Sequence, residues 1–380
     1  MDAEVAIVGA GPAGCAAAYD LAKAGISVLL VDRERTRPKP CGGGLTVRTL
    51  RSLRYRVDPV VRTVCTDLRL SHRQAREKLV ESGQQLCAMT DRWAFDEFCL
   101  ETTKRAGAGL QVVKRVEAVR EQPDGVELET DTGTVRSKFL IGADGADSRV
   151  RKLTGQFAPT HDGVAIEGDL PIRWRPQEIV FDFEAVPEGY GWIFPKGDHL
   201  NVGVCAWSPS AKVTPALLDA YARSRLGTSV PNPRGQRIGT GGWAYEPSSR
   251  RVFLAGDAAG MAEPLLGEGI GNAVRSGQAA AAAILHELRG HGEALRELKR
   301  RLRPIRVDIA SRHASGRIFY ADQSRGFSAI TSPYTRQILV KGYALGLPFW
   351  ALRWLGWWAL ARSGPVSRIA ASGGAAAPRR

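Results

Sequence analysis

The chain has 380 residues, of which 44% are hydrophobic and 24% are charged, and its formal net charge is +14. This length excludes a single small domain and allows two or three domains around a large core. Six cysteines form no C-x-x-C pair and no spacing typical of metal ligands, so we expect reduced thiols, no bound metal and a cytoplasmic protein.

Residues 5–32 read as strand, glycine turn, helix, strand and acid. An apolar run at 5–8 leads into the turn GAGPAG at 9–14, and a second apolar run at 28–31 ends at Asp32. In this context the glycines permit a tight turn, close approach of a pyrophosphate and close packing of helix on strand. The helix N-terminus attracts phosphates, and the acid can accept a hydrogen bond from a ribose hydroxyl. We assign cofactor binding to Gly9, Gly11, Ala13, Gly14, Asp32 and Arg33.

A second glycine cluster follows in the segment PKPCGGG at 38–44. Three consecutive glycines remove side chains where a flat ring and a substrate can stack. Cys41 can donate a proton or pack as a small apolar group, and both alternatives remain open. We assign Cys41 and Gly43 to catalysis, and Cys41 and Gly42 to the cofactor.

The middle of the chain predicts one helix followed by strands. A helix over 92–105 begins after Asp91, and its first residue, Arg92, is a candidate contact to the cofactor or to a phosphate. Apolar segments at 112–120, 126–130 and 135–141, separated by turns, predict a small meander that ends at Asp144, a further cofactor candidate. Short strands broken by Pro and Gly from about 160 to 246 predict an antiparallel sheet with one face over a pocket.

Within that sheet, the segment GYGWIFPK at 189–196 places three aromatic residues at alternate positions. Tyr190, Trp192 and Phe194 therefore face one side of a strand, as the lining of an apolar tunnel or as ordinary sheet core. Lys196 is either a contact to an anionic head group or a solvated strand end. We assign Tyr190 and Trp192 to catalysis, and all four residues to substrate binding.

A third glycine-rich segment begins with Gly256-Asp257 after an apolar strand and runs to Gly267-Glu268-Gly269-Ile270. Asp257 can bind a ribityl hydroxyl, and a helix that starts near Gly269 can direct its positive end at the flavin pyrimidine. With the first turn and Asp144-Gly145, this segment resembles the FAD-binding family that includes p-hydroxybenzoate hydroxylase. The resemblance implies FAD as the cofactor, held in part by Asp257, Gly267, Gly269 and Ile270.

The segments PKPCGGG and YGWIFPK, together with the FAD motifs, resemble the geranylgeranyl reductase family up to about residue 285. That family reduces isolated C=C bonds of polyprenyl chains on lipids, pigment precursors or quinones. The resemblance implies a hydrophobic isoprenoid substrate and hydride transfer from reduced flavin. A second dinucleotide turn is missing, so we expect an external electron donor: ferredoxin, NAD(P)H or a reduced deazaflavin.

Two other functions share the FAD framework. A flavin-dependent monooxygenase acting on an aromatic compound or quinone remains open, whereas a halogenase is disfavoured because Tyr190 and Phe194 replace the first Trp and the Ile of W-x-W-x-I-P. A non-catalytic membrane-associated flavoprotein is a further alternative.

The C-terminal segment is basic and rich in tryptophan. Residues 291–380 hold 16 basic and 4 acidic residues, and Trp350, Trp354, Trp357 and Trp358 share one arc of a helix over 342–361. We expect this helix to lie on an anionic membrane surface, the inner face of the membrane, rather than to span the bilayer; packing against its own protein is the alternative. The segment carries no recognisable nucleic-acid module, so we expect no nucleic acid.

These elements predict an α/β fold: a Rossmann-like FAD-binding domain with an inserted antiparallel β-sheet substrate domain and a C-terminal helical region. We expect the FAD-binding domain at 1–155 and 247–290 and the substrate domain at 156–246. We expect helices at 291–370 and a disordered tail at 371–380.

Overall fold

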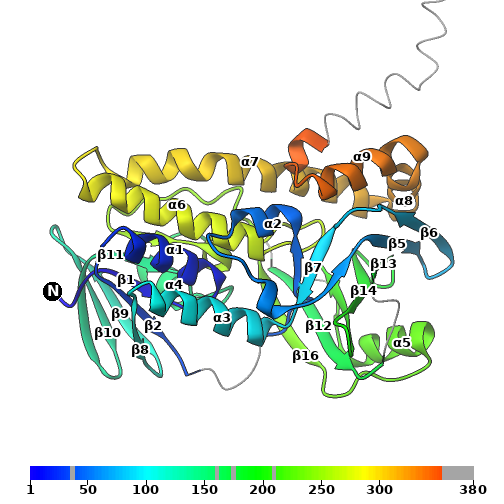
Figure 1. Ribbon diagram of the computed structural model, residues 1–380, viewed down its shortest axis with the longest axis horizontal. Coiled ribbons are helices and arrows are strands. Elements are labelled where there is room, and N and C mark those ends of the chain that lie inside the picture. The colour runs from blue at the N-terminus through cyan, green and yellow to red at the C-terminus, as the bar shows by residue number, and fades with distance from the viewer. Residues whose placement is uncertain (35–38, 159–161, 173–176, 208–210, 353–380) are drawn as a thin grey trace, which may run out of the picture.

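The computed structural model describes residues 1–34, 39–158, 162–172, 177–207 and 211–352. Figure 1 shows one sheet at the left, a second sheet at the right, and long helices running across both. The predicted α/β class with a helical C-terminal region is confirmed. The predicted disordered tail and Trp354, Trp357 and Trp358 lie outside the described residues.

The first sheet has the strand order β8-β2-β1-β11-β10-β9, and β17 also pairs with β11. Its strands are β1 Ala3–Val8, β2 Val28–Asp32, β8 Gly109–Val112, β9 Val116–Glu121, β10 Val126–Thr130, β11 Gly133–Gly142 and β17 Val252–Leu254. The pairs β1–β2, β1–β11, β2–β8 and β11–β17 are parallel, whereas β9, β10 and β11 form the expected antiparallel meander. The carboxyl ends of β1, β2, β11 and β17 therefore point toward one edge, where a dinucleotide binds in open α/β sheets.

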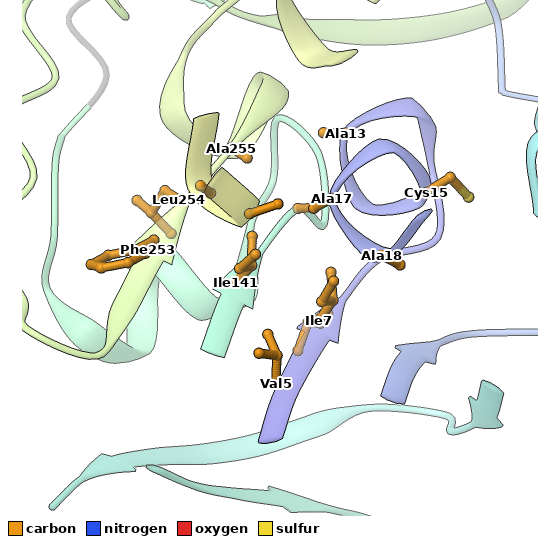
Figure 2. Close-up of a cluster of buried hydrophobic side chains, with 14 of the residues drawn as sticks. Val5, Ile7, Ala13, Cys15, Ala17, Ala18, Ile141, Phe253, Leu254 and Ala255 are labelled. Atoms are coloured by element: carbon orange, nitrogen blue, oxygen red, sulfur yellow. The ribbon is translucent and has the colours of Figure 1, made fainter. Parts of the chain in front are cut away.

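Helices cover this sheet. They are α1 Pro12–Lys23, α3 Arg92–Arg105, α4 Arg149–Thr154 and α6 Ile270–Leu288. The small residues of α1 allow it to pack closely on β1 and α6, and Figure 2 shows Ala17 beside the side chains of Ile7 and Ile141. These apolar side chains are fully buried and belong to the main core, which fixes the glycine turn between β1 and α1.

The second sheet has the order β16-β12-β15-β14-β13-β5-β6. Its strands are β5 Asp67–His72, β6 Arg76–Glu81, β12 Asp162–Leu170, β13 Glu178–Phe183, β14 Gly189–Pro195, β15 Leu200–Ala206 and β16 Arg234–Gly239. The sheet differs from the predicted one in two ways: β5 and β6 come from residues assigned to the FAD-binding domain, and β5 pairs with β13 in parallel. One face packs on α5 Pro215–Leu226 and forms a second core; the other face turns toward the cavity described below.

A small sheet links the two parts through β3 Gly44–Thr46, β7 Cys87–Thr90 and β4 Val61–Cys65, with α2 Val47–Ser52 and the 3₁₀ turns Asp58–Val60 and Gly256–Ala259 beside it. The C-terminal helices are α7 Ala294–Ala321, α8 Gln323–Thr331 and α9 Pro333–Ala344. Helix α7 lies along α6, and α8 and α9 follow it over the second sheet (Figure 1).

The helix expected within 342–361 is interrupted near its start, where Pro348 stands. Helix α9 ends at Ala344, the chain turns at Gly346 with φ +63°, and residues 349–352 are helical again. Phe349 and Leu352 are buried against their own protein, whereas Trp350 is 44% exposed. None of the helices in the described ranges combines the length and apolar character that crossing a membrane requires.

Candidate active site

A cavity of about 1410 Å³ lies at the edge of the first sheet and continues between the second sheet and the C-terminal helices. One end is lined by the glycine turn, the ends of β2 and β11, and the loop before α6. The other end is lined by apolar side chains of β5, β7, β13, β14, α7 and α9. A polar end and an apolar end thus share one continuous space.

The glycine turn leaves no room for side chains at two positions. A Cβ on Gly14 would lie 1.8 Å from the carbonyl oxygen of Gly9, and a Cβ on Gly9 would lie 2.4 Å from the carbonyl oxygen of Ala143. At Gly11, by contrast, no described protein atom lies within 4 Å of the Cβ position, and this residue lines the cavity as the N-cap of α1. The turn therefore brings bare backbone and a helix N-terminus to the cavity.

Carboxylates surround this polar end. Asp32 accepts hydrogen bonds from the amides of Ala10 (3.0 Å) and Arg33 (2.8 Å), which fixes the end of β2. Asp257 lies 3.3 Å from the ammonium of Lys39, so the PKPCGGG loop is joined to the 3₁₀ turn that follows β17. Asp144 also lines the cavity.

The loop before α6 folds around a buried carboxylate. Glu263 is fully buried and accepts from the amides of Leu265 (2.7 Å), Leu266 (2.9 Å) and Glu268 (3.1 Å). Burial raises the pKa of Glu263, and the neighbouring Arg312 lowers it. This arrangement presents Gly267 and Gly269 to the cavity at the N-terminus of α6.

Helix α7 holds the same loop from the other side. The guanidinium of Arg312 lies 3.2 Å from Glu268, 3.5 Å from Glu263 and 3.6 Å from Asp308, and it donates to the hydroxyl of Tyr343 at 3.1 Å. The same guanidinium lies 4.9 Å from the centre of the Phe349 ring. Arg312 thus joins the loop before α6 to α9 and to the segment that follows it.

The PKPCGGG loop crosses the middle of the cavity. Gly43 has φ +67°, and a Cβ there would lie 2.0 Å from the carbonyl oxygen of Thr90. The amide of Gly43 donates to the sulfur of Cys41 at 3.4 Å, and the amide of Cys41 donates to Oε1 of Glu167 at 2.6 Å. Cys41 therefore lines the cavity on a loop that is fixed from both sides.

An aromatic wall, formed by Phe181, Phe183, Tyr190, Trp192 and Phe194, lines the apolar end. Neighbouring rings have centroids 5.3–6.2 Å apart. Trp192 donates from Nε1 to Asn201 at 2.8 Å, and Tyr190 donates from its hydroxyl to the carbonyl of Leu266 at 2.5 Å. The polar atoms of the wall are thus satisfied within the protein, and the ring faces remain available for apolar contact.

Sequence similarity connects this cavity to a known family. A family model described as FAD binding domain matches residues 2–226. The geranylgeranyl diphosphate reductase of Rhodobacter capsulatus is 30% identical over 308 residues, which cover 75% of this chain and 75% of that protein. The chain belongs to the geranylgeranyl reductase family of FAD-dependent oxidoreductases.

Other members and neighbours extend the match beyond residue 285. An uncharacterized protein of Methanosarcina barkeri is 30% identical over 352 residues, covering 91% of each chain. The crystal structure of a geranylgeranyl bacteriochlorophyll reductase-like protein from Thermoplasma acidophilum has a TM-score of 0.77 at 22% identity and covers 97% of this chain and 98% of its own. The flavin-dependent brominase Bmp2 has a TM-score of 0.73 at 17% identity, covering 92% and 94%, so the fold alone does not determine the reaction.

The cofactor of this reductase family member is FAD, and the polar end of the cavity fits it. The side-chain-free turn at Gly9, Gly11 and Gly14 matches what a pyrophosphate requires, and α1 directs its N-terminus at the same place. Asp32 and Asp257 line the same end of the cavity and would serve as acceptors for hydroxyl groups of the bound cofactor. Gly269, the N-cap of α6, also lines the cavity, and this helix N-terminus would favour negative charge on a reduced flavin.

Most residues predicted from the sequence line this cavity in the reductase. They are Gly9, Gly11, Ala13, Asp32, Arg33, Cys41, Gly42, Gly43, Arg92, Asp144, Tyr190, Trp192, Phe194, Asp257, Gly267, Gly269 and Ile270. Gly14 lies behind the turn and serves the packing of α1 on β1. Asp144 lines the cavity, but its two oxygens accept from Ser148 and from the amides of Arg149 and Val150, so it fixes the start of α4.

Lys196 differs from both of its predicted roles. Its ammonium is buried, does not line the cavity and donates to the carbonyls of Gly42 (2.7 Å) and Thr90 (2.5 Å). Burial lowers the pKa of Lys196, while Cys41, Asp91 and Glu167 raise it. In this reductase Lys196 therefore holds the backbone of the glycine loop by hydrogen bonds and does not reach a head group.

Sequence reasoning missed two groups of residues in the reductase cavity. Glu167 lines it from β12, whose sequence DGVAIEGDL holds three acidic residues and gave no signal that singled out Glu167. The C-terminal helical region supplies a second group, which had no recognisable motif. Its members are Phe319, Ile330, Leu339, Val340, Tyr343 and Phe349.

Proposed function

We propose that this protein saturates isolated C=C bonds of a polyprenyl chain of the geranylgeranyl type, carried by a lipid, a quinone or a pigment precursor. The observation that carries this proposal is the continuity between the FAD end of the cavity and the apolar end bounded by the aromatic wall. An isolated alkene offers no hydrogen-bonding group, so its position must be set by shape and apolar contact. The aromatic wall and the C-terminal lining supply such contact.

The chain's own residues position the reactants and exclude water. When bound, FAD supplies the hydride that adds to one alkene carbon. Gly42 and Gly43 line the cavity without side chains, and a Cβ on Gly42 would lie 2.7 Å from the ring of Phe194, so the backbone of this loop lies directly against the aromatic wall. Phe319 packs on Phe183 with ring centroids 4.7 Å apart, which closes the apolar end with a residue of α7.

The electron donor in this proposal is external: ferredoxin, NAD(P)H or a reduced deazaflavin. A matched set of anaerobic reductions tests these donors, each mixed with the FAD-loaded protein and followed by the bleaching of flavin absorbance. The donor that reduces the flavin within the turnover time of the enzyme is the one to assign.

We also place the protein on the surface of an anionic membrane, which suits a substrate dissolved in the bilayer. Ile318 (66% exposed), Tyr334 (62%) and Trp350 (44%) are exposed apolar side chains on the C-terminal helices, whose inner faces line the cavity. The exposed face of α7 carries Arg296, Lys299, Arg300 and Arg303, which are attracted to anionic lipid. Sedimentation with vesicles containing phosphatidylglycerol tests this. We expect Ile318→Ser with Trp350→Ser to weaken binding, and equal binding to neutral vesicles would contradict it.

Mass spectrometry tests the reaction itself. The FAD-loaded protein is reduced with dithionite under argon and mixed with geranylgeranyl diphosphate or geranylgeraniol. Each reduced bond adds two hydrogens, so the mass of the product counts the bonds. The alternative function, a flavin-dependent monooxygenase, is supported by the fold it shares with flavin-dependent halogenases, and it predicts a product heavier by one oxygen when air is admitted. An unchanged chain in argon with a hydroxylated aromatic product in air would replace the proposed function.

A further inference from the structure

Reduction of a C=C bond needs a proton as well as a hydride, and Glu167 on β12 has the surroundings of a proton donor. This residue is 4% exposed and lines the cavity. Its Oε1 accepts from the amide of Cys41 at 2.6 Å. Within the described residues no basic side chain forms a salt bridge with it.

Each of the other acidic side chains that line the cavity in the described ranges accepts hydrogen bonds from backbone amides or lies against a basic side chain. The pairs are Asp32 with the amides of Ala10 and Arg33, Asp96 with Arg92, Asp144 with the amides of α4, Asp147 with Arg237, Asp257 with Lys39, and Glu268 with Arg312. The hydrogen-bonding partners of Glu167 are instead neutral, namely the backbone amide of Cys41 and the side chain of Asn201.

The sheet places Glu167 next to the aromatic wall. In the register of β12, β15 and β14, Glu167 lies opposite Gly203, and Gly203 lies opposite Trp192. A Cβ on Gly203 would lie 2.1 Å from the indole of Trp192, so the indole ring lies over Gly203 and extends toward β12. The carboxyl group is therefore beside the ring surface against which an alkene would lie.

The charged and polar groups around Glu167 come from four other parts of the fold. Lys196 at the end of β14 is bonded to the carbonyls of Gly42 and Thr90, and Arg234 on β16 pairs with Asp169 at 3.2 Å. Cys41 faces it from the glycine loop, and Asn201 lies beside it on β15. Burial raises the pKa of Glu167 to about 7, while the Cys41 amide, Lys196 and Asn201 lower it and Asp169 raises it. A carboxyl group with this pKa holds its proton near neutral pH and can also release it.

We infer that Glu167 is the general acid of the reduction. This inference rests on the proposed function. One alkene carbon accepts a hydride, with its two electrons, from reduced FAD. The electron pair of the C=C π-bond forms a new C–H bond at the other carbon with the proton of the Glu167 carboxyl group. FAD leaves this step oxidised, Glu167 leaves it as a carboxylate, and solvent returns the proton to Glu167 before the external donor reduces FAD again.

Cys41 is the competing donor, and the two residues can be separated. Its amide binds Glu167, so Cys41→Ala keeps the backbone contact and removes only the thiol. If Glu167 supplies the proton, Glu167→Gln slows substrate reduction by about 100-fold or more, which is the range for loss of a general acid. Cys41→Ala then has an effect below about tenfold. The reverse order of the two effects would overturn the assignment.

The kinetic experiment is a single turnover. Dithionite-reduced protein is mixed with geranylgeranyl diphosphate or geranylgeraniol under argon, and reoxidation of the flavin is followed by absorbance. Glu167→Gln is compared with Glu167→Asp, which restores a carboxyl group, and with Glu188→Gln, an exposed control at the start of β14. We expect Glu167→Asp to recover part of the rate with an altered pH profile, and Glu188→Gln to match the wild type. A rate within threefold of wild type for Glu167→Gln, with unchanged FAD affinity, would overturn the proposal.

A second readout does not depend on turnover. Infrared difference spectra of the FAD-loaded protein between acid and alkaline pH report the C=O band of a protonated carboxyl group. We expect a band that titrates near neutral pH in the wild type and is missing from Glu167→Gln. If the wild type reduces none of the polyprenyl probes, the proposed function fails, and the infrared titration alone decides whether Glu167 carries the proton. No band attributable to Glu167 would overturn the inference whatever the substrate.

Discussion

Replacement of Glu167 by Gln is expected to change how the stability of the protein depends on pH. Burial raises the pKa of Glu167 from 4.5 to about 7, so the folded protein keeps a proton that the unfolded chain releases. The carboxyl group of Glu167 makes its full contribution to the free energy of unfolding below pH 4.5, and this contribution is lost as the pH rises through about 7. At about 1.4 kcal/mol for each pH unit, the rise from 4.5 to about 7 corresponds to about 3 kcal/mol.

Gln can accept the same hydrogen bond from the Cys41 amide but does not titrate. Urea unfolding of the FAD-saturated wild type and of Glu167→Gln at about pH 5 and about pH 8.5 measures the difference. About 1 kcal/mol of the contribution is already lost at pH 5, so we expect the variant to gain about 2.5 kcal/mol relative to wild type between the two pH values. All other titrating groups are common to both proteins and cancel. Glu188→Gln is the matched control, and a difference between Glu167→Gln and wild type that stays constant with pH would refute the reasoning.

Three further substitutions test the support of the site. Gly11→Ala should change the free energy of unfolding by no more than about 0.5 kcal/mol but raise the Kd for FAD, because the Cβ position of Gly11 is free of protein atoms. Gly14→Ala should lower the free energy of unfolding and also raise the Kd for FAD, since its Cβ would lie 1.8 Å from the carbonyl oxygen of Gly9. Flavin fluorescence titration and urea unfolding measure the pair, and equal behaviour would contradict the distinction. Lys196→Met removes the donor from the carbonyls of Gly42 and Thr90 and should destabilise the protein by about 3 kcal/mol at neutral pH. An unchanged midpoint of urea unfolding would contradict the role of Lys196 in holding the glycine loop. Arg312→Met leaves the buried Glu263 without its cation, whereas Asp308 keeps its ion pair with Arg48. We expect a loss of about 3–5 kcal/mol and a higher Kd for FAD; calorimetry with and without FAD separates the two effects.

The FAD-binding half of the fold was predictable because its requirements are local. A turn without side chains, followed at once by a helix, needs glycine at fixed positions, and the acid at the end of β2 belongs to the same motif. Arg92 was a harder prediction. It lies in the cavity, yet its guanidinium is paired with Asp96 at 2.9 Å, so its chemistry depends on a partner one helical turn away.

The second sheet was less predictable because its pairing is not local. Strand β5 pairs in parallel with β13, which lies more than a hundred residues later in the sequence, and no feature of residues 67–81 predicts this pairing. A similarly long separation in sequence explains why the contacts of Lys196 were not predicted. Its position after the aromatic strand gave no sign that the carbonyls of Gly42 and Thr90 would surround it.

The C-terminal region shows how a segment without a motif still determines the site. Arg312 contacts Glu263 and Glu268, which shape the loop that carries Gly267 and Gly269 to the flavin, and it also contacts Tyr343. Tyr343 lines the apolar end of the cavity. Any movement of α9 would therefore disturb the partners of Arg312, and through them the loop that carries Gly267 and Gly269. Because a buried cation cannot lose its carboxylates without a large cost, the apolar end and the flavin loop of the cavity are coupled through this one side chain.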